Sequence, residues 1–244
     1  MKLKVIGFWG GYPAKNEASS GYLIEHDGFS LLVDCGSGVV SQLQNYMNPN
    51  DIDAVILSHY HPDHQADVGI LQHALLIQQI LGKEKKNVPI YAHNKNKYEF
   101  DKLTYRDITK GMVYDENQIV KTGPFTISFM KTKHPELCYA MRIEAGDKVL
   151  VYTADTAYMD QLIEFAKDAD LLLAESNFYS DMDAAKAGHM TSKEAAHIAA
   201  AAGVKTLILT HLPHFGDISK LKEEASEVFA GDIYLAESGL EIHL

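Results

Sequence analysis

The chain has 244 residues, 46% of them hydrophobic, and is long enough to bury a substantial core. Its formal net charge is −11 with histidine counted as neutral. This charge disfavours a broad nucleic-acid-binding groove, because an acidic surface repels polyanions. The sequence has neither a run of about 18 uninterrupted apolar residues nor a signal-like N-terminal segment, so we expect a cytoplasmic protein without a membrane span.

Short apolar runs separated by glycine, aspartate, asparagine and proline predict strands in both halves of the chain. In the first half these runs are Lys2–Phe8, Gly21–His26, Ser30–Asp34, Ala54–Ser58 and Pro89–His93. In the second half they are Phe125–Lys131, Tyr139–Ala145, Lys148–Thr153, Leu171–Glu175, Lys205–Thr210 and Ile233–Ala236.

Helical patterns lie between these strands, at Gln65–Leu81, Ala157–Lys167, Ser192–Ala202 and Leu221–Phe229. The third is the best defined, because Thr191 and Glu194 have the spacing of a capping box and Gly203 can end the helix. The order of strands and helices repeats along the chain. It predicts an α/β fold forming one domain over residues 1–244, with αββα halves at roughly 1–105 and 106–244. We expect two β-sheets packed together with helices on the outer faces.

The segment from Ser58 to His64 reads Ser-His-Tyr-His-Pro-Asp-His and follows a predicted strand. Two histidines two residues apart at a strand end point the same way, and the turn through proline brings the later side chains beside them. Nitrogen and oxygen ligands of this kind suit a divalent metal such as Zn²⁺. One ion cannot easily use all four ligands and stay open to substrate, so the segment predicts two adjacent ions. The predicted ligands are His59, His61, Asp63 and His64.

Further ligands must come from elsewhere, and His134, Asp155 and His211 each follow a predicted strand. Strand ends on one edge of a sheet can converge on one spot, so we expect these side chains to complete the site. A single carboxylate such as Asp155 can bridge two cations about 3.5–4 Å apart.

The pattern from His59 to His64 resembles the HxHxDH signature of the metallo-β-lactamase superfamily, and the later ligands follow in the order H, D, H that the superfamily uses. The resemblance extends from Gly7 to His211 and implies an αββα sandwich. It implies two Zn²⁺ ions, with Mn²⁺ as the alternative. The implied ligand sets are His59, His61 and His134 for one metal and Asp63, His64 and His211 for the other, with Asp155 bridging.

Two later segments resemble the ribonuclease Z (ELAC) branch of this superfamily. They are Leu171–Phe178, similar to its HEATF-type element, and Gly188–Thr191, similar to its GHST element. The resemblance implies that Glu175 and His189 form a proton-delivery pair, acting in catalysis together with Asp63. The match is partial, since Ala174, Asn177 and Met190 depart from the pattern.

The segment Leu32–Gly38 is similar to the DCGEG turn of the same branch, with Ser37 where glutamate is common. The resemblance implies that Asp34 orients a metal-binding histidine without itself binding the metal.

These features predict a phosphodiesterase in which a dinuclear zinc site generates hydroxide from water. The expected substrates are a small or cyclic phosphodiester or an RNA 3′ end. Two observations argue against tRNA as the substrate: the acidic charge, and the lack of the long Gly- and basic-rich arm with which ribonuclease Z clasps tRNA. Similar proteins are often homodimers, so we expect a homodimer.

Two other functions remain open. The same metals could serve a thioester or lactone hydrolase similar to glyoxalase II or lactonases, although the context of His134 lacks their TPGHTxG-like pattern. A binding module that keeps the fold without catalysis is the other alternative, and the complete set of seven ligands argues against it.

Overall fold

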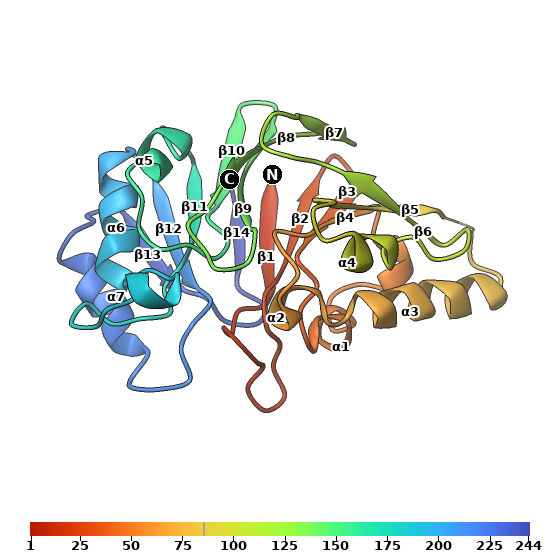
Figure 1. Ribbon diagram of the computed structural model, residues 1–244, viewed down its shortest axis with the longest axis horizontal. Helices are drawn as coiled ribbons and strands as arrows, with labels where there is room; N and C mark the ends of the chain where they lie inside the picture. The colour runs from red at the N-terminus through yellow and green to blue at the C-terminus, as the bar shows by residue number, and fades with distance from the viewer. Residues whose placement is uncertain (85) are drawn as a thin grey trace. The chain divides into compact units, whose positions relative to one another are not determined.

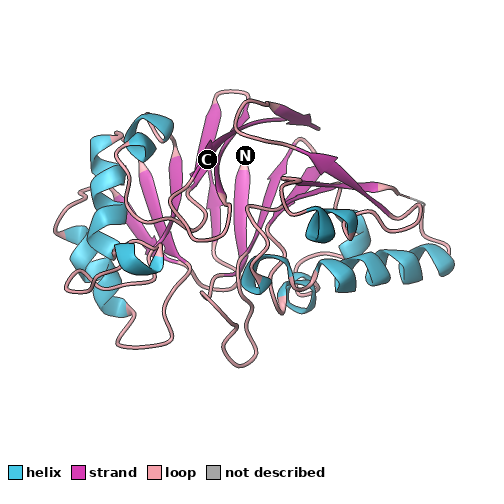
Figure 2. Ribbon diagram, in the orientation of Figure 1, coloured by secondary structure: helices cyan, strands magenta, loops and turns pink. Residues whose placement is uncertain are grey.

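The computed structural model describes residues 1–84 and 86–244. Within them the chain forms two compact units, each with a seven-stranded sheet (Figures 1 and 2). The first unit comprises Met1–Gly7, Gly11–Asp115 and Ser238–His243. The second comprises Phe8–Gly10, Glu116–Glu237 and Leu244. Whether residues 1–244 behave as a single domain stays a prediction.

The sheet of the first unit has the order β14-β1-β2-β3-β4-β5-β6. Its strands are β1 (Lys2–Gly7), β2 (Gly21–His26), β3 (Phe29–Val33), β4 (Ala54–Ile56), β5 (Val88–Ala92), β6 (Thr109–Val113) and β14 (Glu241–His243). Strands β3 to β6 are parallel, whereas β14, β1, β2 and β3 pair antiparallel. Every residue of β4 is buried, as expected for a central parallel strand with an unbroken apolar sequence.

The helices of the first unit are α1 (Val39–Leu43), α2 (Pro62–Gln65), α3 (Val68–Ile80) and α4 (Lys97–Asp101), with a 3₁₀ turn at Pro49–Asp51. The prediction of one helix over Gln65–Leu81 is wrong at its start, because the chain leaves the helical conformation at Asp67. There the Asp67 carboxylate accepts a hydrogen bond from the Val40 N–H at 3.0 Å. Helix α3 then buries Leu71 and Leu75 in the core of this unit.

The sheet of the second unit has the order β13-β12-β11-β10-β9-β8-β7. Its strands are β7 (Val120–Thr122), β8 (Phe125–Lys131), β9 (Tyr139–Ala145), β10 (Lys148–Tyr152), β11 (Leu171–Glu175), β12 (Thr206–Thr210) and β13 (Asp232–Leu235). Strands β10 to β13 are parallel and β7 to β10 antiparallel. All of β11 is buried, again in the parallel part of the sheet.

The helices of the second unit are α5 (Gln161–Phe165), α6 (Ser192–Ala201) and α7 (Ser219–Ser226), with a 3₁₀ turn at Ala185–Ala187. The capping box of Thr191 and Glu194 predicted for α6 is confirmed. Helix α6 contacts β11 and β12, and α7 contacts β13. The predicted helix Ala157–Lys167 is too long, because α5 covers only Gln161–Phe165.

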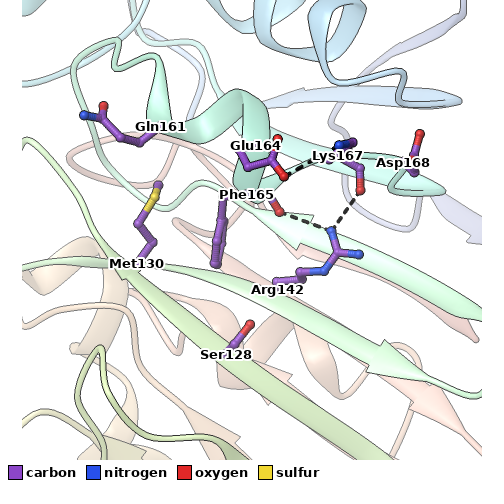
Figure 3. A pocket seen from close by; sticks show the side chains of 8 residues that line it. All are labelled: Ser128, Met130, Arg142, Gln161, Glu164, Phe165, Lys167 and Asp168. Atoms are coloured by element: carbon purple, nitrogen blue, oxygen red, sulfur yellow. Dashed lines mark hydrogen bonds and ion pairs between the residues drawn. The ribbon is translucent and has the colours of Figure 1, made fainter.

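Arg142 on β9 holds the end of α5, as Figure 3 shows. Its Nη1 atom donates to the carbonyls of Phe165 and Lys167, both at 3.1 Å, and its Nε atom donates to Glu144 at 2.8 Å. These bonds satisfy carbonyls that a helix end leaves without an internal donor. The cavity beside Arg142, of about 590 Å³, is lined by none of the predicted metal ligands.

Among the described residues, no helix combines the length and apolar character required to cross a bilayer.

Candidate metal-binding site

Predicted site residues of the first unit follow the parallel strands β3 and β4. Asp34 comes directly after β3, and Ser58 and His59 come shortly after β4. The carboxyl ends of parallel strands meet at one edge of a sheet, which is where α/β proteins commonly bind ligands. Asp34 has a left-handed backbone with a φ angle of 57°, an uncommon conformation for a non-glycine residue that is often found at functional sites.

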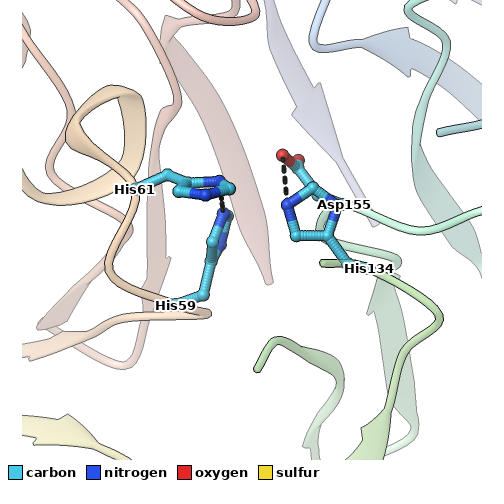
Figure 4. Close-up of side chains that lie close together, drawn as sticks. All are labelled: His59, His61, His134 and Asp155. Atoms are coloured by element: carbon cyan, nitrogen blue, oxygen red, sulfur yellow. Dashed lines mark hydrogen bonds and ion pairs between the residues drawn. The ribbon is translucent and has the colours of Figure 1, made fainter. Parts of the chain in front are cut away.

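His59 and His61 form the first ligand pair. His59 Nε2 lies 3.0 Å from His61 Nδ1, and Figure 4 shows the two rings approaching edge to face. The reason given for this convergence from the sequence is wrong, because β4 ends at Ile56 and both histidines lie beyond it. The loop that follows the strand, rather than the alternation of side chains along it, brings the two nitrogens together.

Asp63 and His64 form the second pair, at the start of α2. Asp63 Oδ2 accepts the N–H of Gly11 at 2.6 Å and lies 3.6 Å from His64 Nε2. The other ring nitrogen of His64, Nδ1, lies 2.8 Å from Asp34 Oδ2. The predicted contact between Asp34 and one of the histidines proposed as ligands is therefore present. A histidine held through Nδ1 in this way presents Nε2 to a metal.

Cys35 lies beside this pair, and its N–H donates to the carbonyl of His64 at 2.8 Å. Burial raises the pKa of its thiol well above the usual value, and the carboxyls of Asp67 and Asp34 raise the pKa further. Cys35 and Cys138 are both buried, and neither forms a disulfide within the described residues.

In the second unit, Asp155 lies close to both predicted histidine ligands. Its Oδ2 atom is 3.9 Å from His134 Nε2 and 3.4 Å from His211 Nε2. Figure 4 shows the ring of His134 beside Asp155. His134 Nδ1 lies 3.0 Å from the carbonyl of Gly188, so this ring too is held at Nδ1 and presents Nε2.

His211 directly follows β12 and is held by its neighbours in an uncommon conformation. Its φ angle is 53°, and its carbonyl accepts a hydrogen bond from Asn177 Nδ2 at 2.9 Å. Gly10 packs against the ring so closely that a Cβ atom there would lie 2.7 Å from His211 Nδ1. The sequence interpretation assigned no role to Gly10. The only signal available was the glycine pair Gly10–Gly11 shortly after the first predicted strand.

Glu175 and His189, predicted as a pair, are in contact. His189 Nδ1 lies 2.9 Å from Glu175 Oε1. Glu175 is fully buried and also accepts the N–H groups of Thr156 and Met190, at 2.8 Å and 3.2 Å. The side chain of His189 is 17% exposed, and its ring is stacked on His211 with centroids 5.2 Å apart. A buried, fixed carboxylate therefore orients a partly accessible imidazole next to a predicted ligand.

The donor chemistry of both units fits a divalent metal. Imidazole nitrogens and carboxylate oxygens are the ligands that Zn²⁺ and similar ions use. In the first unit the two pairs each have ligand atoms within 4.8 Å, and in the second unit Asp155 is within 4.8 Å of both histidines. His64 and His134 are each held from behind at Nδ1, as metal-binding histidines usually are.

Comparison with known proteins identifies the class. The family model described as "Beta-lactamase superfamily domain" matches residues 30–212, which is most of the chain. The chain therefore belongs to the β-lactamase superfamily.

Individual relatives agree with this assignment. "Probable metallo-hydrolase YhfI" of Bacillus subtilis is 54% identical, over 98% of this chain and 98% of its own. The crystal structure of the metallo-β-lactamase fold protein YhfI from Bacillus subtilis has a TM-score of 0.97 at 52% identity, covering 99% of this chain and 98% of that chain. A ribonuclease Z of Methanopyrus kandleri is 28% identical, over 100% of this chain and 98% of its own. The predicted fold class is confirmed, and the chain is a metallo-hydrolase of the β-lactamase fold.

Proposed function

We propose that the chain is a phosphodiesterase that depends on two divalent cations. The proposed ligand sets are His59, His61 and His134 for one cation and Asp63, His64 and His211 for the other, with Asp155 bridging. The paired donors within each unit support this assignment. The contacts that hold His64 and His134 at Nδ1 support it as well. Two Zn²⁺ ions are the proposed metals, with Mn²⁺ as the alternative, because the donor set mixes imidazole with carboxylate.

The contact between His189 and Glu175 is the observation that favours phosphodiester chemistry. When bound, the cations would supply an activated water and positive charge for the phosphoryl oxygens. An alkoxide leaving group also needs a proton, and His189 is positioned beside His211 to donate one. Glu175 holds the ring through Nδ1, which leaves Nε2 as the nitrogen that would donate the proton.

A thioester substrate would make less use of this pair. A thiolate is a much weaker base than an alkoxide, since thiols have a pKa of about 8.5, and it departs without an acid. The presence of a buried carboxylate that orients an imidazole therefore favours an oxygen leaving group. The proposed substrates are a small or cyclic phosphodiester or an RNA 3′ end. The net charge of −11 argues against tRNA, because a tRNA-binding surface must neutralise many phosphates.

The test is turnover of bis(p-nitrophenyl) phosphate by protein that is first chelated and then reloaded with Zn²⁺ or Mn²⁺. We expect turnover only after reloading. On a phosphodiester with an alkoxide leaving group, such as a ribodinucleotide, the variant His189→Ala should lower kcat by about 10²–10⁴-fold with unchanged metal content, as removal of a general acid does. Bis(p-nitrophenyl) phosphate should be affected far less, because its nitrophenolate leaving group is a weak base and departs without an acid. His197→Ala is the matched control, because His197 is an exposed histidine on α6.

A panel of thioesters, lactones and an unprocessed tRNA completes the experiment. Turnover of thioesters or lactones without turnover of any phosphodiester would overturn the proposal. Efficient cleavage of the tRNA would keep the phosphodiester chemistry but contradict the proposed restriction to smaller substrates.

A further inference from the structure

Ser58 is a fully buried serine that directly precedes the first predicted ligand. Its hydroxyl Oγ lies 2.8 Å from Asp34 Oδ2, 3.0 Å from His59 Nδ1 and 3.4 Å from His64 Nδ1. Its backbone N–H also donates to Asp34 Oδ1, at 2.7 Å. One hydroxyl is thus in contact with a carboxylate and with two predicted ligands that belong to different cations.

The hydrogen-bonding capacity of these groups fixes where the protons lie. A carboxylate can only accept, and a hydroxyl has one proton to donate, so the Ser58 O–H donates to Asp34 Oδ2. The lone pairs of Oγ are then left to accept, and His59 Nδ1 is within reach to donate. His64 Nδ1 lies closer to Asp34 Oδ2 than to the Ser58 hydroxyl, so its proton points to the carboxylate.

Both histidines therefore carry their proton on Nδ1 and present the lone pair of Nε2. For His64 the controlling group is Asp34 itself. For His59 it is the same carboxylate acting through the Ser58 hydroxyl. In the opposite tautomer, His59 would turn a lone pair toward the Oγ lone pairs and lose this hydrogen bond.

We propose that Ser58 is a positioning residue that fixes the tautomer and ring orientation of His59. Its hydroxyl donates a proton to the Asp34 carboxylate and accepts the Nδ1 proton of His59, so that Asp34 acts on a second histidine through Ser58. The metal-binding consequence rests on the proposed function, because it assumes that His59 binds one cation and His64 the other. One carboxylate then controls one ligand of each cation, which couples the two positions through the protein.

The effect on metal binding is measured by competition of Zn²⁺ between the full chain and a chelator. Loss of a group that supports a ligand histidine typically weakens metal binding by about 10–100-fold. We expect Ser58→Ala to lower the affinity for one of the two Zn²⁺ ions by this factor. The affinity for the other ion should stay within about threefold of wild type. Ser58→Thr keeps the hydroxyl and should restore binding. The control Ser19→Ala removes an equally buried hydroxyl that has no hydrogen-bond partner among the described residues.

A readout that needs no metal tests the proton assignment directly. Long-range ¹H–¹⁵N NMR of the chelated chain reports which nitrogen of His59 carries the proton. We expect Nδ1–H in wild type and a mixture of tautomers in Ser58→Ala. An Nε2–H tautomer of His59 in the wild-type chain would overturn the proposal without any variant having to fold.

The outcomes separate this proposal from the proposed function. If the chain binds no Zn²⁺, the proposed function fails, while the NMR result still decides whether Ser58 sets the tautomer of His59. If Zn²⁺ binds and Ser58→Ala behaves like Ser19→Ala in both measurements, the role of Ser58 is refuted and the metal site stands.

Discussion

Replacing Gly10 by alanine tests whether the backbone beside His211 shapes the metal-binding site. The added Cβ atom would lie 2.7 Å from both Nδ1 and Cε1 of the His211 ring. It would also press on Asn177 Nδ2, the group that donates to the His211 carbonyl. Gly10 is not among the residues with positive φ, so the substitution adds a collision without adding backbone strain.

The size of the effect follows from the distances. Carbon atoms attract best at about 3.5–4.0 Å, so the ring or the Gly10 backbone must move by about 0.8 Å or more to relieve the contact. Metal–ligand distances tolerate only about 0.2 Å. A shift of this size should therefore lower the affinity for the cation that His211 is proposed to bind by about 10–100-fold. This loss is comparable with that caused by removing a group that supports a ligand histidine.

The assay is Zn²⁺ competition on Gly10→Ala, with thermal unfolding as a check of the fold. Gly69→Ala is the matched control, because a Cβ atom at Gly69 in α3 would have no atom within 4 Å. We expect Gly69→Ala to bind Zn²⁺ as wild type does. Unchanged affinity for both cations in Gly10→Ala would show that the close packing does not position His211.

Each of three further predictions rests on contacts that lie within a single unit. Asp34→Asn keeps a residue that tolerates a left-handed backbone but turns an NH₂ group toward Ser58 or His64, and should weaken Zn²⁺ binding by about 10–100-fold in the same competition assay. Burial raises the pKa of the Asp170 carboxyl, but Lys205 and a backbone N–H outweigh it and leave the pKa below its usual range. The pair thus stabilises the fold above about pH 4, and the difference in unfolding free energy from Asp170→Asn, about 1 kcal/mol or less at pH 7, should shrink in urea titrations as the pH falls further. Arg142→Met removes the donors at the end of α5 and should lower the free energy of unfolding by about 1–3 kcal/mol in urea, with Zn²⁺ binding unchanged.

The sequence predicted those parts of the fold whose signals are local. Buried apolar runs placed the central strands within one or two residues, and the capping box placed α6. It missed the short elements β6, β7, β14, α1 and α4, which contain only three to five residues each. Runs this short carry too little periodicity to be recognised, and β14 exists because it pairs with β1 from the far end of the chain.

In the site, too, the predictable contacts join residues that are close in sequence or that lie in recognisable motifs. The proximity of His59 to His61 and of Asp63 to His64 was predictable because these residues are close in sequence. The contact of Glu175 with His189 was predictable because both lie in recognisable motifs. The roles proposed for Ser58 and Gly10 were not predictable. Each depends on a residue distant in sequence, Asp34 for Ser58 and His211 for Gly10, and only the packed structure shows these contacts.

The two units hold their histidines by different physical means. In the first, hydrogen bonds to one buried carboxylate, Asp34, hold the Nδ1 atom of His64 directly and that of His59 through the Ser58 hydroxyl. In the second, a backbone carbonyl fixes His134, while a left-handed backbone and the close approach of Gly10 fix His211. A change in side-chain chemistry should therefore disturb the first set, whereas a change in volume should disturb the second. The contrast between Asp34→Asn, which alters hydrogen bonding at constant size, and Gly10→Ala, which alters size alone, separates these two means of orienting a ligand.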